Sequence, residues 1–203
     1  GFNTLMILDK EPCKPFDKNR QGLNLGEGAA FLVLESEEIV KKTGKKVLAE
    51  LTGYGNSCEA FHQTASTPEG KGAFAAMKEA LDRSGLRTDQ IDYINAHGTG
   101  TDNNDLSEGR AIQTLFGASI PKVSSTKSYT GHTTSAAGGV EAVISILSIL
   151  NNTIFPNLNF KEQMEELTFK PVTELLENVK VDHVLSNSFG FGGNNSALIF
   201  SRY

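Results

Sequence analysis

The stretch Ile91-Asp92-Tyr93-Ile94-Asn95-Ala96-His97-Gly98-Thr99-Gly100-Thr101, residues 91–101, indicates the fold more strongly than any other part of the chain. It opens as a short β-strand and ends in a loop of glycines and hydroxyls that carries His97. Such loops let the backbone approach a ligand closely. Open α/β sheets bind ligands at the carboxyl ends of their strands. We therefore expect His97 in a ligand site with its imidazole exposed; a histidine that caps a tight turn is the alternative.

A second histidine, His132, follows Lys127-Ser128-Tyr129-Thr130-Gly131 and precedes a helix rich in alanine and glycine. A position near a helix N-terminus lowers the histidine pKa and keeps the ring neutral at pH 7. A neutral ring can donate a hydrogen bond to a carbonyl. The alternative for His132 is a structural role, in which the ring packs against a neighbouring element. Lys127 lies among hydroxyl side chains and is placed for polar contacts; the alternative is a solvated surface lysine. A zinc site would need a third ligand, and no metal-binding motif supports one; the nearest candidates are Asp102, Asp105 and Glu108.

The third loop is Asn187-Ser188-Phe189-Gly190-Phe191-Gly192-Gly193-Asn194-Asn195. It is not a dinucleotide fingerprint, because the element after it reads as a short strand and that fingerprint must open a helix. A glycine-rich turn can present N–H groups as an oxyanion hole. A hairpin turn that needs positive φ angles is the alternative.

Hydrophobic periodicity places strands and helices in alternation along the chain. We expect strands at 25–35, 47–54, 91–96, 121–125, 181–187 and 196–201, the last two forming a hairpin. Helices are expected at 37–43, 70–84, 104–116 and 133–150, and residues 151–171 as irregular with one short helix. The near-continuous apolar run at 25–35 predicts a central strand covered on both faces. This order favours a single layered α/β domain.

Composition excludes several other classes of protein. The chain has 203 residues, a net charge of −5 and 38% apolar residues, which argues against nucleic-acid binding through overall charge. Cys13 and Cys58 lack metal or redox spacing and are expected to be inert thiols. The first residues do not read as a signal peptide. The apolar run from Gly139 to Leu150 is too short for a membrane span and carries Glu141, so we expect a soluble cytoplasmic protein.

Together these loops resemble the β-ketoacyl-acyl-carrier-protein synthases, the elongating condensing enzymes of the thiolase-like fold. The matching stretches occur in the family's order: 14–17, 25–28, 97–101, 124–132, 136–138 and 187–193. The resemblance covers the C-terminal half of such an enzyme. It implies that residues 1–203 form a thiolase-like α/β domain, with a five-stranded mixed sheet between helices. The family's nucleophilic cysteine lies in the N-terminal half, in a Thr-Ala-Cys-Ser-Ser type of segment that neither Cys13 nor Cys58 matches.

The resemblance implies a decarboxylative Claisen condensation of malonyl-acyl-carrier protein with an acyl thioester, as in fatty acid or polyketide elongation. His97 and His132 would bond the malonyl thioester carbonyl and stabilise the enolate. Two donors aimed at one developing oxyanion lower the barrier by a few kcal/mol each. Lys127 matches the active-site lysine, and Glu108 matches an acidic residue expected to interact with it.

Other positions match the substrate channel of the family. Thr99 and Thr101 match threonines that bond the phosphopantetheine arm, and Gly192 belongs to the substrate-binding loop. Phe191 matches the phenylalanine that gates the acyl pocket, and its N–H would contribute to the oxyanion hole. No cofactor is expected beyond the phosphopantetheine of the carrier, and no catalytic metal. Some members hold a structural cation at positions that match Asn95, Glu141, Ser186 and Asn187.

The expected partners are an acyl carrier protein and the N-terminal half of the synthase, within a homodimer or heterodimer. Lys18 and Arg20 fall near a face suited to an acidic carrier, with solvated surface charge as the alternative. We expect this half alone to lack activity and to expose a large apolar face. The alternative functions are a non-catalytic thiolase-fold partner subunit, or an inactive fragment that binds acyl or pantetheine groups. The sequence leaves acyl chain length and product class open.

Overall fold

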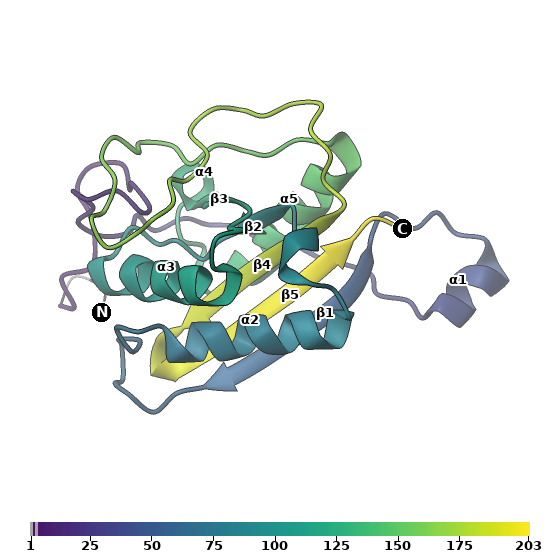
Figure 1. Cartoon of the computed structure of the whole chain (residues 1–203), viewed down its shortest axis with the longest axis horizontal. Helices are drawn as coiled ribbons and strands as arrows, with labels where there is room; N and C mark the ends of the chain where they lie inside the picture. Colours follow the sequence, from purple (N-terminus) through teal and green to yellow (C-terminus); the bar gives the residue numbers. More distant parts are fainter. Residues whose placement is uncertain (1, 3) are drawn as a thin grey trace.

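A five-stranded mixed sheet forms the centre of the computed structural model, which describes residue 2 and residues 4–203 (Figure 1). Its strands lie in the order β1 (Glu50–Cys58), β5 (Asn194–Ser201), β4 (His183–Gly190), β2 (Tyr93–Asn95) and β3 (Lys122–Ser124). The pairs β1–β5 and β5–β4 are antiparallel, whereas β4–β2 and β2–β3 are parallel. The predicted mixed sheet and the C-terminal hairpin are confirmed.

Helices cover both faces of this sheet. Helices α2 (Lys71–Ser84) and α3 (Asp102–Phe116) lie on one face, and α5 (Ala137–Asn151) lies on the other (Figure 1). Helix α2 approaches β1 so closely that β1 needs glycine: a Cβ at Gly53 would lie 2.3 Å from the carbonyl oxygen of Ala80. The remaining helical segments are short: α1 (Glu37–Thr43), α4 (Lys127–Thr130), and the 3-10 turns Thr88–Gln90, Thr134–Ala136 and Phe191–Gly193.

One helical stretch in the described part of the chain, Thr134–Asn151, is long and apolar enough to pass for a membrane span. In the fold it is a packing element. Ala142 and Ile149 pack with Tyr93 of β2 in the core on that face of the sheet. Glu141 is buried and ion-paired inside the domain. The prediction of a buried core helix therefore holds for the face that meets the sheet.

The predicted central strand at 25–35 is wrong. Residues 26–35 are not in regular secondary structure, apart from an isolated bridge between Leu25 and His132 at the start of the run. Phe31, Val33 and Leu34 are 92%, 87% and 72% exposed. A strand needs a neighbour for its N–H and C=O groups, and the described residues place none beside this run. The first half of the run lies against α5, where Ala30 is next to Gly139. Its second half and α1 form an arm that projects from the body of the domain (Figure 1).

Smaller differences concern the ends and connections of elements. Strand β1 begins at Glu50 and runs to Cys58, later than the predicted 47–54. The short helix predicted within 151–171 is also wrong, because residues 152–171, all described, contain no helix. Buried polar side chains hold this segment instead: the Asp17 carboxylate accepts the N–H groups of Lys161 and Glu162 at 2.6 and 2.8 Å. Asn157 bridges the segment to two other loops.

Candidate active site

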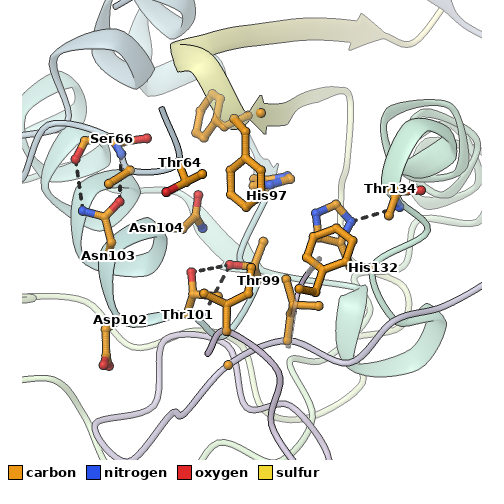
Figure 2. Close-up of a pocket in the computed structure, with 18 of the residues that line it drawn as sticks. Thr64, Ser66, His97, Thr99, Thr101, Asp102, Asn103, Asn104, His132 and Thr134 are labelled. Carbon is orange, nitrogen blue, oxygen red and sulfur yellow. Dashed lines mark hydrogen bonds between the residues drawn. The ribbon is translucent and has the colours of Figure 1, made fainter. Parts of the chain in front are cut away.

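Three loops meet at one edge of the sheet, because β2, β3 and β4 are parallel and their carboxyl ends point the same way. His97 follows β2, Lys127 follows β3, and the Phe191 turn follows β4. They surround a cavity of about 610 Å³ whose lining includes both histidines, Thr99, Thr101, Phe189 and Phe191. The rings of His97 and His132 lie edge to face, with centroids 5.3 Å apart (Figure 2).

His97 is held in place from both sides. The Glu108 carboxylate accepts the backbone N–H groups of His97 and Gly98 at 2.9 and 2.8 Å. The Lys127 Nζ lies 3.1 Å from His97 Nδ1 and donates to the His97 carbonyl oxygen at 2.6 Å. Since the ammonium group can only donate, Nδ1 accepts and the ring proton sits on Nε2. His97 is only 4% exposed, so the expectation of an exposed imidazole is wrong, although the residue lines the cavity.

His132 has the same tautomer for a different reason. Its Nδ1 accepts the backbone N–H of Thr134 at 3.2 Å (Figure 2), which leaves the proton on Nε2. Thr134 has a φ of 51°, a left-handed conformation that is unusual for a β-branched residue. This strain turns its N–H toward the histidine. The backbone of His132 is fixed by hydrogen bonds to the carbonyl of Asn24 and the N–H of Gly26.

Both imidazoles are neutral at pH 7. Burial lowers the pKa of His97 well below its usual 6.5, and the charge of Lys127, together with that of His132 once it is protonated, acts in the same direction. Burial, followed by the charge of Lys127, lowers the pKa of His132 to about 4. The neutral form predicted for His132 is therefore confirmed, but burial rather than a helix terminus leads its causes. Each ring offers an Nε2–H donor.

Lys127 is a buried residue, 1% exposed, and its carboxylate partner is Glu141 on α5. The prediction that Glu108 pairs with this lysine is wrong. Glu108 instead accepts three hydrogen bonds, from the N–H groups of His97 and Gly98 and from Asn187 Nδ2. Burial raises the pKa of Glu141 to about 7 against the opposing attraction of Lys127. Glu108 fixes the histidine loop, and Glu141 fixes the lysine.

Thr99, Thr101 and Phe191 of the predicted channel line the cavity, and Gly192 does not. The Oγ1 atoms of Thr99 and Thr101 are 2.8 Å apart, and both residues line the cavity (Figure 2). Phe191 is half-exposed, with its ring centroid 6.3 Å from that of Phe2. The N–H of Gly192 donates to the carbonyl of Gln63 at 2.9 Å. Gly192 therefore shapes the turn, at a φ of 80°, and its N–H is not directed at a ligand.

Sequence reasoning gave no positioning role to Asp105, which is fully buried in the first turn of α3. Its carboxylate accepts the N–H groups of Phe16 at 2.7 Å and Gly100 at 3.2 Å, so it anchors the same loop as Glu108. Burial raises its pKa. Asp105, Glu108 and Ile112 recur at helical spacing on the buried face of α3, and that periodicity was the available signal.

The predicted surface role of Arg20 is wrong. Arg20 is 8% exposed and donates to the carbonyls of Asp17, Thr101 and Asp102. Lys18, in contrast, is exposed and ion-paired with Glu162 and Glu165. Arg20 therefore holds the loops together and is not free for a partner.

Both cysteines are free thiols, as expected. Cys13 is buried, and burial raises its pKa; Cys58 is exposed. Neither lines the cavity beside the histidines.

The residues matched to a structural cation lie together on the sheet and α5. Asn95 is the register partner of Ser186, and Asn187 follows on β4. Glu141 Oε2 and Asn187 Oδ1 are buried without a hydrogen-bond partner among the described residues. Oxygen atoms of this kind are ligands that hard cations prefer, so the residues fit such an ion. The described part of the chain contains no group of three His, Cys, Asp or Glu side chains arranged for a metal.

The fold places the chain among thiolase-like ketosynthases. The structure of the ishigamide ketosynthase/chain length factor superposes with a TM-score of 0.94 at 39% identity, covering 100% of this chain and 50% of that one. A type II polyketide synthase acyl-carrier protein in complex with its ketosynthase bound to the hexaketide also gives 0.94, at 28% identity, covering 100% of this chain and 52% of that one.

The sequence comparisons specify the family. Residues 48–161 match the model of the β-ketoacyl synthase C-terminal domain, and the chain belongs to this family. The 3-oxoacyl-[acyl-carrier-protein] synthase 2 of Coxiella burnetii (strain RSA 493 / Nine Mile phase I) is 46% identical over 210 residues, covering 100% of this chain and 51% of the relative. The chain spans about half the length of the curated relatives it matches.

Proposed function

We propose that this chain supplies the two-histidine part of the active site of a β-ketoacyl-acyl-carrier-protein synthase. Such an enzyme condenses malonyl-acyl-carrier protein with an acyl thioester in fatty acid or polyketide-type elongation. The observation that carries the proposal is the pair of buried, neutral imidazoles at one cavity, each with its proton on Nε2. The names of the relatives, which are 3-oxoacyl synthases and ketosynthases, support the same reaction class.

In the proposed reaction the thioester carbonyl oxygen of the malonyl group accepts hydrogen bonds from Nε2 of His97 and His132. The bond between the α-carbon and the carboxylate breaks, carbon dioxide leaves, and the electron pair moves onto the thioester oxygen as an enolate. Two fixed donors in a site sheltered from water stabilise that charge more than they stabilise the neutral carbonyl. The enolate carbon then attacks an acyl group held on a cysteine, a carbon–carbon bond forms, and the thiolate leaves.

Neutral histidines suit this step because they donate hydrogen bonds without a proton transfer. Burial, and after it the positive charge of Lys127, lowers the pKa of both rings, and the Lys127 Nζ fixes the tautomer of His97. Glu141 compensates the buried ammonium group. Lys127, Glu141 and Glu108 are therefore positioning residues in this proposal.

The other channel residues take supporting roles in the proposal. The hydroxyls of Thr99 and Thr101 bond the phosphopantetheine arm of the carrier, which is the only prosthetic group required. Phe191 gates the acyl pocket, and its N–H contributes to the oxyanion hole. Gly192 keeps the turn in its left-handed conformation. A cation held by Asn95, Glu141, Ser186 and Asn187 would neutralise buried oxygen atoms and stiffen the sheet edge.

The nucleophilic cysteine comes, in this proposal, from polypeptide outside these 203 residues, so the chain is inactive by itself. Neither Cys13 nor Cys58 is among the residues that line the cavity. The projecting arm is evidence for a second polypeptide that covers it, because the apolar side chains of Phe31, Val33 and Leu34 are exposed to solvent. Residues of that pattern are normally covered on both faces. The chain on its own should therefore aggregate or associate abnormally.

Two further partners follow from the proposal. One is an acyl carrier protein, which the 28%-identical neighbour binds. The other is a second subunit in a homodimer or heterodimer, as the pairing of a ketosynthase with a chain length factor suggests. Lys18 is an exposed cation available to an acidic carrier, although it already neutralises two glutamates. We place the assembled enzyme in the cytoplasm.

Reconstitution tests the proposal. The chain is combined with a nucleophile-bearing N-terminal half, checked by native mass spectrometry, and supplied with an acyl thioester and malonyl-acyl-carrier protein. A 1:1 complex that releases a β-ketoacyl product supports it. A complex that binds the carrier but forms no product supports the alternative of a non-catalytic partner subunit. The structure does not favour that alternative, because the contacts among His97, Lys127 and Glu141 are intact. Failure to assemble overturns the missing-half account.

A further inference from the structure

The loop between β1 and α2 forms one wall of the cavity. Thr64, Ala65 and Ser66 line it. In the view of Figure 2, Thr64 and Ser66 lie across from His132 and Thr134. This wall was not identified from the sequence, which shows only an unstructured stretch around Ser57 to Pro68.

One side chain holds that wall to helix α3. Asn103, in the first turn of α3, accepts the N–H of Ser66 through Oδ1 at 2.8 Å and donates from Nδ2 to the Ser66 carbonyl at 3.0 Å (Figure 2). The amide therefore satisfies both backbone groups of one loop residue, as a neighbouring β-strand would. Asn103 itself also lines the cavity.

Hydrogen bonds, and not buried apolar contacts, hold the loop between residues 60 and 67. None of these residues, all described, is buried, and Phe61 is 54% exposed. The Thr67 hydroxyl donates to Glu59 within the loop. Beyond it, Arg110 donates to the Pro68 carbonyl at 3.1 Å, so the end next to α2 is anchored separately. A segment held by hydrogen bonds rather than by buried apolar contacts opens locally at low cost.

The other side of the loop meets the turn that carries Phe191. The Gly192 N–H donates to the carbonyl of Gln63 at 2.9 Å, and the Glu59 N–H donates to the carbonyl of Gly193 at 3.1 Å. The loop thus lies between Asn103 and the Phe191 turn. The contact of Asn103 with Ser66 therefore also fixes the loop where it meets the Phe191 turn.

We propose that Asn103 is a positioning residue that fixes this wall of the cavity, and so the width of the cavity, for a pantetheine-borne substrate. The substrate class in this inference rests on the proposed function. The claim that Asn103 holds the loop at Ser66 does not. The histidines are anchored by Glu108, Lys127 and Thr134, none of which hydrogen-bonds to the loop. Loss of Asn103 should therefore weaken substrate binding and leave the chemical step intact.

The test compares Asn103→Leu with Gln113→Leu. Gln113 makes the same kind of bridge further along α3, from its amide to the carbonyl of Glu166 and the N–H of Thr168, away from the cavity. Both variants lose a two-way amide bridge, so their stability losses should be similar. Asn103→Asp keeps the acceptor for Ser66 N–H and should lie between wild type and Asn103→Leu.

Hydrogen exchange of the purified full chain gives the structural readout. In Asn103→Leu, the amides of Thr64, Ser66 and Gly192, whose N–H groups have hydrogen-bond acceptors at this wall, should exchange about tenfold faster or more, the loss of roughly one to two net hydrogen bonds. In Gln113→Leu their exchange should not change. Equal exchange in the two variants overturns the inference.

Kinetics of the reconstituted enzyme give the second readout. Asn103→Leu should raise KM for malonyl-acyl-carrier protein about tenfold at unchanged kcat, and Gln113→Leu should change neither. A fall in kcat alone overturns the inference. A wild-type enzyme without turnover counts against the proposed function only, and the exchange result then decides on Asn103.

Discussion

The buried pair Lys127–Glu141 should show strong energetic coupling, because neither side chain has a second ion-pair partner among the described residues. Both side chains are at most 2% exposed. In Glu141→Gln the Lys127 ammonium group keeps His97 as its partner but loses the one carboxylate that it contacts in the described part of the chain. In Lys127→Met the Glu141 carboxyl group loses its partner. Burial, the largest cause of the lowered pKa of both histidines, remains, and the smaller effect of the Lys127 charge disappears.

The magnitude follows from the burial of the pair. Breaking a buried ion pair by removing one partner costs about 3–5 kcal/mol, whereas removing both charges is far cheaper. For a chain of this size 1 kcal/mol corresponds to about 2–4 °C in Tm, so each single variant should lose roughly 6–20 °C. The double variant Lys127→Met/Glu141→Gln should be less destabilised than either single variant, so the coupling energy should be about 3 kcal/mol or more.

Urea unfolding of the two single variants and the double variant measures this coupling. The cycle is repeated with Glu108→Gln in place of Glu141→Gln, which should couple to Lys127 more weakly because Glu108 binds backbone N–H groups and Asn187 instead. The exposed pair Glu37–Lys41 serves as a control and should show no measurable coupling. A coupling below about 0.5 kcal/mol for Glu141, or a larger one for Glu108, would refute the assignment of the lysine's partner.

Three further outcomes are expected. Nitrogen NMR should find His97 and His132 protonated on Nε2 and uncharged from pH 8 to 5; because both pKa values are lowered on folding, their contribution to stability is complete above pH 6.5 and is lost as pH falls toward 4. A ring that titrates near 6.5 contradicts this. Arg20→Gln should lower the free energy of unfolding by about 2–4 kcal/mol, since three backbone carbonyls lose a buried charged donor, and Lys18→Gln should not alter it; equal urea midpoints would argue against the buried role. Gly55→Ala should cost about 3 kcal/mol or more in thermal unfolding, because its Cβ would lie 2.1 Å from a carbonyl oxygen of α2, and a Tm equal to wild type would contradict that close approach.

The sequence predicts those helices and strands whose apolar residues pack against other elements of the same chain. Helix α2 carries its apolar residues at helical spacing, and Gly85 ends it with a φ of 69°. The strand before His97 and the C-terminal hairpin were likewise predictable from periodicity. The prediction of a strand at 25–35 was wrong because an apolar pattern indicates that residues will be buried, but it does not indicate which polypeptide buries them.

The site was predictable as loops and not as contacts. Glu108 and Glu141 are both acidic residues on helices near the histidines, and only the packing of α5 brings Glu141 to Lys127. Arg20 looked like surface charge because arginines usually are, yet the turn around it presents three carbonyls to one guanidinium group. Choices among chemically similar side chains depend on tertiary geometry, which spacing along the chain does not specify.

Decarboxylation by the reconstituted enzyme tests the central claim most directly. Release of carbon dioxide from malonyl-acyl-carrier protein is measured for wild type, His97→Ala and His132→Ala. His183→Ala serves as the control, at the start of β4 and away from the cavity. Loss of one fixed donor to a developing oxyanion costs about 10²–10³ in rate, so each active-site variant should fall by that factor and the control should not. Wild-type rates in both His97→Ala and His132→Ala would contradict the account.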